Sequence, residues 1–386
     1  MAIYRRDMLI GTGAVISAAV FAEACGRAKS VPRTLDASAP SEPPIIEAVR
    51  YGITAPSAHN TQPWRIELVS DSEARLYMDP ERLLPATDPP ARQTHMSHGT
   101  FVELMAIGAS HFGYRADIEL LPDGEMSPAD FGAKPTAYIR LVEAPDVAVD
   151  PLFSYVLVRR TSRLPHEGAM VTQDELASIL EHAQRPGLQT GLISEAQLPE
   201  ALDIVRAAMT IEVNDYELYD ETRHWFRFSK REVKEHRDGL SISTAGLTGF
   251  AAGSANMFLN AKNFHKEKNR NRYQETFGEA VASTRGLLFM KSTKNDMVDW
   301  IETGRAYARA QLAGEMLGLR FQPVSQVLQE YPQMDALRQR FEAFMGVEPP
   351  AKVQMLVRIG RTATPGLSPR RPIGDFIDQQ ETTQQA

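Results

Sequence analysis

Apolar and polar positions change their period several times after residue 44, which predicts a fold containing both helices and strands. Helical spacing of apolar residues occurs at 45–53 and 100–112. Short apolar or alternating runs that predict strands occur at 64–68, 74–78, 137–142 and 353–360. This mixture predicts the α+β class, with the run at 353–360 as the last strand of the core.

One segment of this pattern recurs later in the chain. Gly99 precedes an apolar helical run that ends before Gly113, and Gly304 precedes a similar run that ends before Gly318. Both glycine pairs are 14 residues apart, and the two copies lie 205 positions apart. Glycine is common just after the end of a helix. A repeated amphipathic helix can arise by chance, but the matched spacing favours two fused halves.

The segment from about 205 to 285 has no counterpart in the first half. A polar helix is predicted at 212–234, and a stretch rich in Gly, Ala and Ser follows at 245–256. Small residues with little charge suit a mobile cover over a ligand, and a loosely packed linker is equally compatible with them. The segment is therefore predicted to be an insertion that acts as a lid.

A polar loop reads Pro-Ser-Ala-His-Asn-Thr-Gln-Pro-Trp at 56–64. In an extended segment Asn60 and Gln62 would point the same way. With the Ser57 hydroxyl, they offer donors and acceptors at fixed spacing to a planar ligand with polar edges, while Trp64 anchors the loop in the core. On composition alone, a polar turn before a buried strand would be the favoured interpretation.

A basic string, Arg-Arg-Thr-Ser-Arg, occupies 159–163. Its three guanidinium groups suit phosphate oxygens in a bidentate manner, and its two hydroxyls add short hydrogen bonds to the same group. Alone, such a string is more often an exposed basic turn. Whether this string indicates phosphate binding therefore depends on the loop at 56–64.

Together, the two strings resemble the PSxxNxQPW and RR[ST]xR segments of the nitroreductase superfamily. The resemblance implies a nitroreductase-like α+β fold with FMN between two subunits, one of which supplies the loop and the other the phosphate clamp. It implies FMN contacts from the loop residues Pro56, Ser57, Asn60 and Gln62. It implies phosphate contacts from the clamp residues Arg159, Arg160, Thr161 and Arg163.

Each half of this chain carries one of the two segments. No arginine-rich clamp precedes the helix at 45–53, and no second polar loop occurs near 185–187. We therefore expect a pseudo-dimer that works as a monomer with one FMN site. After residue 44 the chain resembles the Acg-like fused branch, which carries a lid over a single FMN. In the superfamily, a C-terminal segment returns to the FMN phosphate. The resemblance implies this role for Arg370 in the first place and for Arg371 in the second.

The first 25 residues are typical of a twin-arginine signal peptide. Arg5 and Arg6 precede an apolar run at 10–22 that is too short for an ordinary membrane span. Export to the periplasm is therefore predicted. Cys25 is the only cysteine and stands where a lipobox would place an acylated residue, although Glu23 departs from that pattern. Membrane attachment through Cys25 and release as a free protein both stay open.

These features give a predicted organisation of the chain. A signal peptide (1–25) and a linker (26–43) precede the first half (44–150). The second half (151–375) contains the lid insertion at about 205–285, and a disordered tail follows at 376–386. With 386 residues and 43% hydrophobic content, the chain can bury a large core.

Net charge and residue spacing argue against two kinds of partner, nucleic acid and metal ions. The net charge of −7 argues against nucleic acid, because phosphate backbones require a broad basic surface. His95 and His98 stand three apart without further ligands nearby, so no metal is predicted.

The resemblance implies an FMN-dependent oxidoreductase that transfers hydride to or from a small aromatic, a quinone or an activated alkene. The electron donor stays unknown, because soluble NAD(P)H is not expected outside the cytoplasm and no G-x-G-x-x-G unit follows a strand. No catalytic residue is assigned. The alternatives are a flavin storage or sequestration protein, and a binding protein without FMN.

Overall fold

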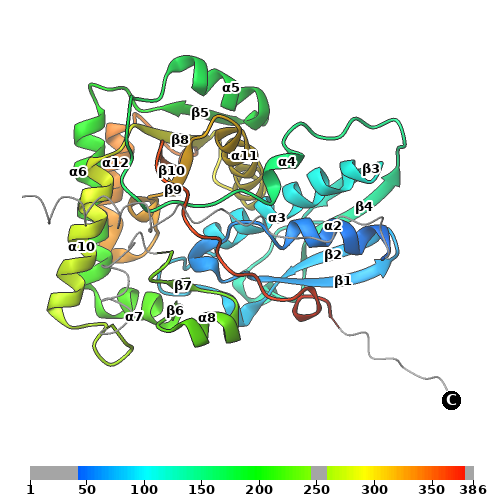
Figure 1. The fold of residues 1–386 in the computed structure, drawn as a ribbon, viewed down its shortest axis with the longest axis horizontal. Helices are drawn as coiled ribbons and strands as arrows, with labels where there is room; N and C mark the ends of the chain where they lie inside the picture. The colour runs from blue at the N-terminus through cyan, green and yellow to red at the C-terminus, as the bar shows by residue number, and fades with distance from the viewer. Residues whose placement is uncertain (1–41, 245–258, 379–386) are drawn as a thin grey trace, which may run out of the picture.

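Two four-stranded antiparallel sheets with equivalent strand orders form the two halves of the chain (Figure 1). The computed structural model describes residues 42–244 and 259–378. The first sheet has the order β1 (Trp64–Ser70), β2 (Glu73–Met78), β4 (Pro135–Glu143) and β3 (Tyr114–Leu120). The second has the order β5 (Leu188–Leu192), β8 (Gly286–Ser292), β10 (Lys352–Gly360) and β9 (Arg320–Pro323). The predicted α+β class is confirmed.

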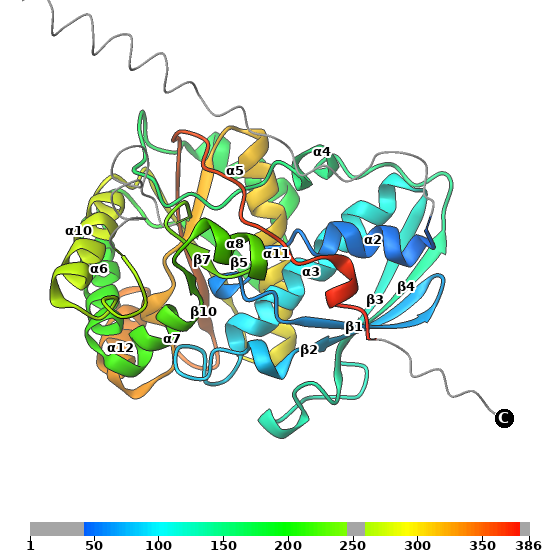
Figure 2. The same ribbon diagram turned by 60° about the horizontal axis from the view of Figure 1, so that its bottom comes forward.

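Each sheet packs against one long helix and one shorter helix. In the first half these are α3 (Arg92–His111) and α2 (Pro44–Gly52), and in the second half α11 (Met297–Met316) and α5 (Gln173–Ala183). Both ends of α11 lie 205 positions after those of α3, which is the offset of the sequence repeat. The two long helices lie side by side at the centre of the molecule (Figure 2). The repeat thus corresponds to the pair of helices that joins the halves.

The backbones of α3 and α11 touch at two glycines. A Cβ atom added to Gly99 would lie 2.0 Å from the carbonyl oxygen of Ile301, and one added to Gly304 would lie 2.0 Å from that of Met96. Met96 and Ile301 are themselves 205 positions apart, so the contact is reciprocal. Only glycine permits so close an approach.

The insertion lies between β5 and β8 and spans residues 193–285, somewhat earlier than the predicted start near 205. Its described elements are α6 (Leu198–Asn214), α7 (Tyr216–His224), β6 (Phe226–Arg227), α8 (Lys230–His236), β7 (Leu240–Ser241) and α10 (Glu267–Ala282). With α12 (Asp335–Phe344), they enclose a second apolar core beside the second sheet. The Gly/Ala/Ser-rich stretch at 245–256 lies outside the described residues, as does the predicted signal peptide.

Two predicted helices differ from those in the structure. The helix expected at 100–112 begins at Arg92, because buried Asp88 accepts hydrogen bonds from the backbone NH groups of Gln93 and Thr94. The single polar helix expected at 212–234 is wrong. Asp215 separates α6 from α7 and accepts hydrogen bonds from the first NH groups of α7, and β6 separates α7 from α8.

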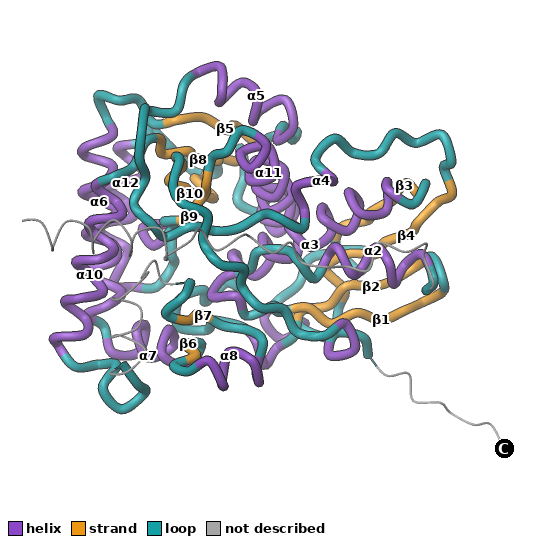
Figure 3. Tube along the Cα trace, in the orientation of Figure 1, coloured by secondary structure: helices purple, strands orange, loops and turns teal. Residues whose placement is uncertain are grey.

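The predicted disordered tail at 376–386 is wrong for its first three residues. The Ile66 NH donates to the carbonyl oxygen of Phe376 (2.7 Å), and the Asp378 NH donates to that of Ile66 (2.9 Å). The Phe376 ring is buried with its centroid 6.1 Å from that of Trp64. The tail therefore crosses from the second half to the edge of the first sheet, mostly as loop (Figure 3).

The remaining described elements are short. They are α4 (Phe153–Val156) and the 3-10 turns η1 (Ala58–Asn60), η2 (Pro80–Arg82), η3 (Pro128–Asp130), η4 (Gln326–Leu328), η5 (Pro332–Met334) and η6 (Ile373–Asp375). Within the described residues, no helix is long and apolar enough to cross a membrane.

The contact at Gly304 predicts a large loss of stability on substitution. Gly304→Ala should lower the free energy of unfolding by about 3 kcal/mol, because the new methyl group would force two helix backbones apart. Gly278→Ala is the matched control, because Gly278 lies in α10 with open space around its Cβ position. This second change should stabilise the protein by up to about 1 kcal/mol through helix propensity. Urea unfolding of both variants measures the difference, and similar values for the two would refute the close helix contact.

Candidate functional site

The loop between α2 and β1 is a tight turn, so the prediction of an extended segment is wrong. Three of its residues have left-handed backbone angles: His59 (φ 46°), Asn60 (φ 56°) and Gln62 (φ 54°). Such angles are uncommon for residues other than glycine and tend to mark functional sites. The Ser57 hydroxyl helps to hold the turn by accepting a hydrogen bond from the Gln62 NH at 3.0 Å.

The two amides of this loop have different environments. Gln62 is fully buried, and its side chain donates to the Arg237 carbonyl (3.0 Å) and accepts from the Arg371 NH (2.9 Å). It thus fixes the loop to the insertion and to the tail, and it does not line either of the cavities described below. Asn60 instead lines a cavity, while its oxygen accepts from Arg370 at 2.8 Å. The contact of Gln62 with a cofactor stays a prediction.

The basic segment at 159–163 precedes α5 and runs beside β9, where the Ser162 NH donates to the carbonyl of Phe321 (3.0 Å). Arg159 reaches across to the first half, where it donates to the carbonyl of Thr54 at 2.9 Å. Arg370 donates to the same carbonyl at 3.0 Å. The basic segment, the tail and the start of the polar loop therefore meet at one point.

A small cavity lies at this meeting point, with a volume of about 50 Å³. Its walls come from four segments that lie far apart in the sequence. They are Pro56, Ser57 and Asn60 from the loop; Arg159, Arg160, Thr161 and Arg163 from the basic segment; Gly239, Leu240 and Thr244 from the insertion; and Ser368 and Arg370 from the tail. The structure thus brings together every predicted site residue except Gln62 and Arg371, and the Arg371 side chain lies against Asp375 and Phe376 instead.

The cavity is strongly cationic. Burial lowers the pKa of the guanidinium groups of Arg159, Arg160 and Arg163, because each loses hydration. No carboxylate among the described residues forms an ion pair with these three side chains. Glu315, the carboxylate that interacts electrostatically with Arg159 and Arg160, is paired with Arg320 at 2.8 Å. Buried cations without a counter-ion are costly, so the cavity suits an anion such as a phosphate group.

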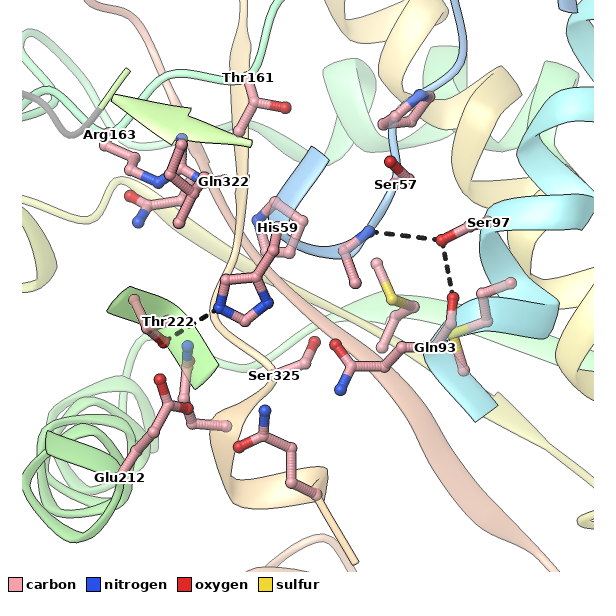
Figure 4. Close-up of a pocket in the computed structure, with 18 of the residues that line it drawn as sticks. Ser57, His59, Gln93, Ser97, Thr161, Arg163, Glu212, Thr222, Gln322 and Ser325 are labelled. Atoms are coloured by element: carbon pink, nitrogen blue, oxygen red, sulfur yellow. Dashed lines mark hydrogen bonds between the residues drawn. The ribbon is translucent and has the colours of Figure 1, made fainter. Parts of the chain in front are cut away.

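A larger cavity of about 180 Å³ adjoins the small one and shares residues of its wall, including Thr161 and Arg163 (Figure 4). Part of its lining is apolar, from Met96, Met209, Leu240, Phe277 and Met355. The polar part includes His59, Gln93, Ser97, Glu212, Thr222, Gln322, Ser325 and Gln329. Such a mixed wall suits a flat organic molecule with polar edges.

Sequence reasoning missed these polar residues of the larger cavity. They come from α3, α6, α7, β9 and loops, and no local spacing connects them. Only His59 stood inside a recognised motif. Glu212 was interpreted only as the first residue of a polar helix, although its side chain is 4% exposed.

Two titratable groups of the larger cavity have altered pKa values. Burial, together with the nearby charge of Arg163, lowers the pKa of His59 to about 4, so its ring is neutral near pH 7. The Nε2 atom of this ring lies 3.2 Å from the Thr222 hydroxyl. Burial is also the main factor that raises the pKa of Glu212 to about 7. The wall of this cavity is therefore less charged near pH 7 than its residue types suggest.

The two histidines considered as metal ligands have protein partners. His95 Nδ1 lies 2.7 Å from the Ala91 carbonyl, and His98 contacts the Thr136 hydroxyl (2.6 Å) and the Pro63 carbonyl (2.9 Å). In the described part of the chain, no group of three or more His, Cys, Asp or Glu side chains could hold a metal ion.

Comparison with known proteins gives relatives over most of the chain, while no protein-family model matches it. The protein named "Putative NAD(P)H nitroreductase acg" of Mycobacterium tuberculosis is 25% identical over 346 residues, which cover 86% of this chain and 95% of the relative. A second mycobacterial protein with a similar nitroreductase name is 26% identical over 196 residues, covering 50% of this chain and 54% of that relative.

Nitroreductases are among the solved structures with detectable similarity. The FMN and NADPH-dependent nitroreductase NfnB of a Sphingopyxis strain has a TM-score of 0.40 at 15% identity, over 60% of this chain and 99% of that one. A nitroreductase with bound FMN from Bacteroides fragilis has a TM-score of 0.33 at 14% identity, over 60% and 97%. The sequence relatives confirm the predicted resemblance to the nitroreductase superfamily and to its Acg-like branch.

Proposed function

We propose that the protein is an FMN-dependent oxidoreductase of the nitroreductase type, with one FMN held between its two halves. The observation that carries the proposal is the cationic cavity, where buried guanidinium groups of the second half face the polar loop of the first half. Its continuity with a larger cavity of mixed polarity matches a ligand with a phosphate at one end and a flat ring system at the other. The nitroreductase relatives support the same function.

The residues of the two cavities fit the parts of FMN. Arg159, Arg160, Arg163 and Arg370 would hold the phosphate, and the Thr161 hydroxyl would donate to it. The ring would occupy the larger cavity, where the left-handed turn at 58–62 keeps its polar groups in fixed positions. Bound flavin supplies two-electron chemistry, and the protein supplies orientation, charge neutralisation and exclusion of water.

Because the two halves are equivalent, a second site would lie beside α11 as the first lies beside α3, and ion pairs fill that place. Ser97 and Thr100 of α3 line the larger cavity, and their equivalents on α11, 205 positions later, are Glu302 and Arg305. These two side chains pair with each other at 2.8 Å, and Arg185 joins Glu302 (3.1 Å) to Glu103 (2.8 Å). The turn between α5 and β5 is also much shorter than the loop between α2 and β1. These contacts support a single FMN site.

We therefore expect the purified protein to bind one FMN per chain after reconstitution. Flavin absorbance of the desalted protein, divided by protein concentration from amino-acid analysis, measures the ratio. Size-exclusion chromatography with light scattering checks that the binding unit is a monomer. Two FMN per chain, or no FMN, would contradict the single site.

Arg163→Ala should weaken FMN affinity by about 1.5–3 kcal/mol, which is the scale for losing a hydrogen bond to a charged group. The free energy of unfolding without FMN should stay constant or increase, because the change removes a cation that no carboxylate pairs with. Arg231→Ala is the control, because Arg231 lies on the exposed face of α8. Titration of the apoprotein with FMN measures each affinity. Equal affinities for the two variants would show that Arg163 does not bind the phosphate.

We propose that a small neutral aromatic, quinone or activated alkene is the substrate. The relatives have names that include NAD(P)H as donor, whereas an exported protein would require a quinol or a partner protein. Anaerobic mixing of the FMN-loaded protein with NADPH or with menadiol distinguishes these donors by the rate of flavin bleaching. Bound FMN that neither donor reduces would favour storage of flavin.

Export by the twin-arginine route is also proposed, on the basis of Arg5, Arg6 and the apolar run at 10–22. Changing both arginines to lysine should leave the protein in the cytoplasm, because the receptor reads a guanidinium pair. Cell fractionation measures the location, and Cys25→Ala tests lipid attachment in the same experiment. Continued export of the double lysine variant would refute the proposed signal.

A further inference from the structure

Glu212 occupies an unusual position in the larger cavity. It belongs to α6 and is only 4% exposed, yet its Oε2 atom is buried without a protein partner. The side-chain amide of Gln329 interacts with the carboxyl group. Figure 4 shows the Glu212 side chain on the same side of the cavity as Thr222, with His59 beside them. Glu212 therefore lines the cavity and has one carboxyl oxygen that no protein group satisfies.

The net effect of the surroundings of Glu212 is to favour its protonated form. Its electrostatic neighbours are Glu221 and Tyr219 of α7, Tyr273 of α10, and Tyr331 before η5. No described Lys or Arg forms an ion pair with Glu212. Loss of hydration is the main effect that raises the pKa of Glu212 to about 7. The hydrogen bond with Gln329 opposes this shift, and the charge of Glu221 adds to it. At neutral pH a large fraction of Glu212 therefore carries a proton, unlike an exposed glutamate.

We propose that Glu212 is the proton donor of this cavity and that its carboxyl group binds a carbonyl oxygen of a neutral quinone. A neutral carboxyl donates a hydrogen bond to such an oxygen and can transfer its proton as negative charge develops there. The other polar groups nearby, such as the neutral His59 ring and the Thr222 hydroxyl, also suit an uncharged ligand. Methionine and phenylalanine side chains supply apolar surface for its ring.

The proposed step rests on the proposed function, and its atoms and electrons balance. A quinone becomes a hydroquinone by taking up two electrons and two protons. Both electrons and one hydrogen nucleus would come from the reduced flavin, as a hydride equivalent. The second proton leaves Glu212 as its O–H bond breaks and an O–H bond forms on the quinone oxygen. Solvent returns a proton to the Glu212 carboxylate before the next cycle.

The protonation of Glu212 can be measured without flavin or turnover. Infrared spectra of the apoprotein at pH 7, in H2O and D2O, should contain a carbonyl band of a protonated carboxyl group that titrates near pH 7. Glu212→Gln should remove this band. Glu200→Gln is the matched control, because Glu200 is exposed on the same helix. Absence of the band from the unaltered protein, or its persistence in Glu212→Gln, would overturn the proposal.

The proton transfer has a separate readout. The reduced holoprotein is mixed anaerobically with menadione (a methylated naphthoquinone) between pH 5.5 and 9, and flavin reoxidation is recorded. The rate constant at saturating menadione should fall about tenfold per pH unit above pH 7, because the carboxyl group loses its proton there. In Glu212→Gln this constant should be about 100-fold lower at pH 6 and independent of pH. The dissociation constant of menadione should change less than about threefold, since the amide still donates a hydrogen bond.

The outcomes separate this inference from the function on which it rests. Unaltered reoxidation and pH dependence in Glu212→Gln would refute the role of Glu212 while the flavoprotein assignment stands. If the protein binds no FMN, the proposed function fails instead. In that case the infrared band, and menadione binding that weakens above pH 7, would still show that Glu212 is a protonated ligand-binding group. Menadione binding without such pH dependence would then overturn its role.

Discussion

The contact between the backbones of α3 and α11 is the constraint on which the rest of the structure depends. Because Gly99 and Gly304 let the two helices touch, the halves meet closely enough for Arg159 of one half to bond Thr54 of the other. The polar loop and the basic segment then share one cavity. A wider helix separation would move the two segments apart and remove the site. The close packing of α3 and α11 is therefore a requirement for the cavity that the two segments form.

Electrostatics distinguishes the two sides of this helix pair. On one side, buried Glu103 pairs with Arg185, Arg305 and Arg309, so that charges compensate one another within the protein. On the other side, Arg159 and Arg160 are buried without a carboxylate partner among the described residues. A self-paired network stabilises the fold and leaves no attraction for a ligand, whereas an uncompensated cluster costs folding energy that an anion offsets on binding. The same fold thus gives a structural side and a binding side.

The sequence predicted those parts of the molecule that depend on local spacing or on contiguous motifs. The offset between Gly99 and Gly304 predicted the two equivalent helices, and two short strings predicted seven of the residues that line the small cavity. The left-handed turn at His59 was not predicted, because contacts made by the insertion and the tail hold it. Glu212 was not recognised either, because its burial results from packing between elements rather than from the polar pattern of its own helix.

The separation between the cationic end and the neutral end of the combined cavity is a physical requirement of the proposed chemistry. A guanidinium close to Glu212 would favour the carboxylate and so lower its pKa. Tyr273 interacts with both ends, since Glu212 raises its pKa and Arg163 lowers it. The phenol therefore lies within electrostatic range of both groups without carrying charge near neutral pH. A phosphate bound at the cationic end would offset the charge of Arg163, so occupation of one end should help to keep a proton at the other.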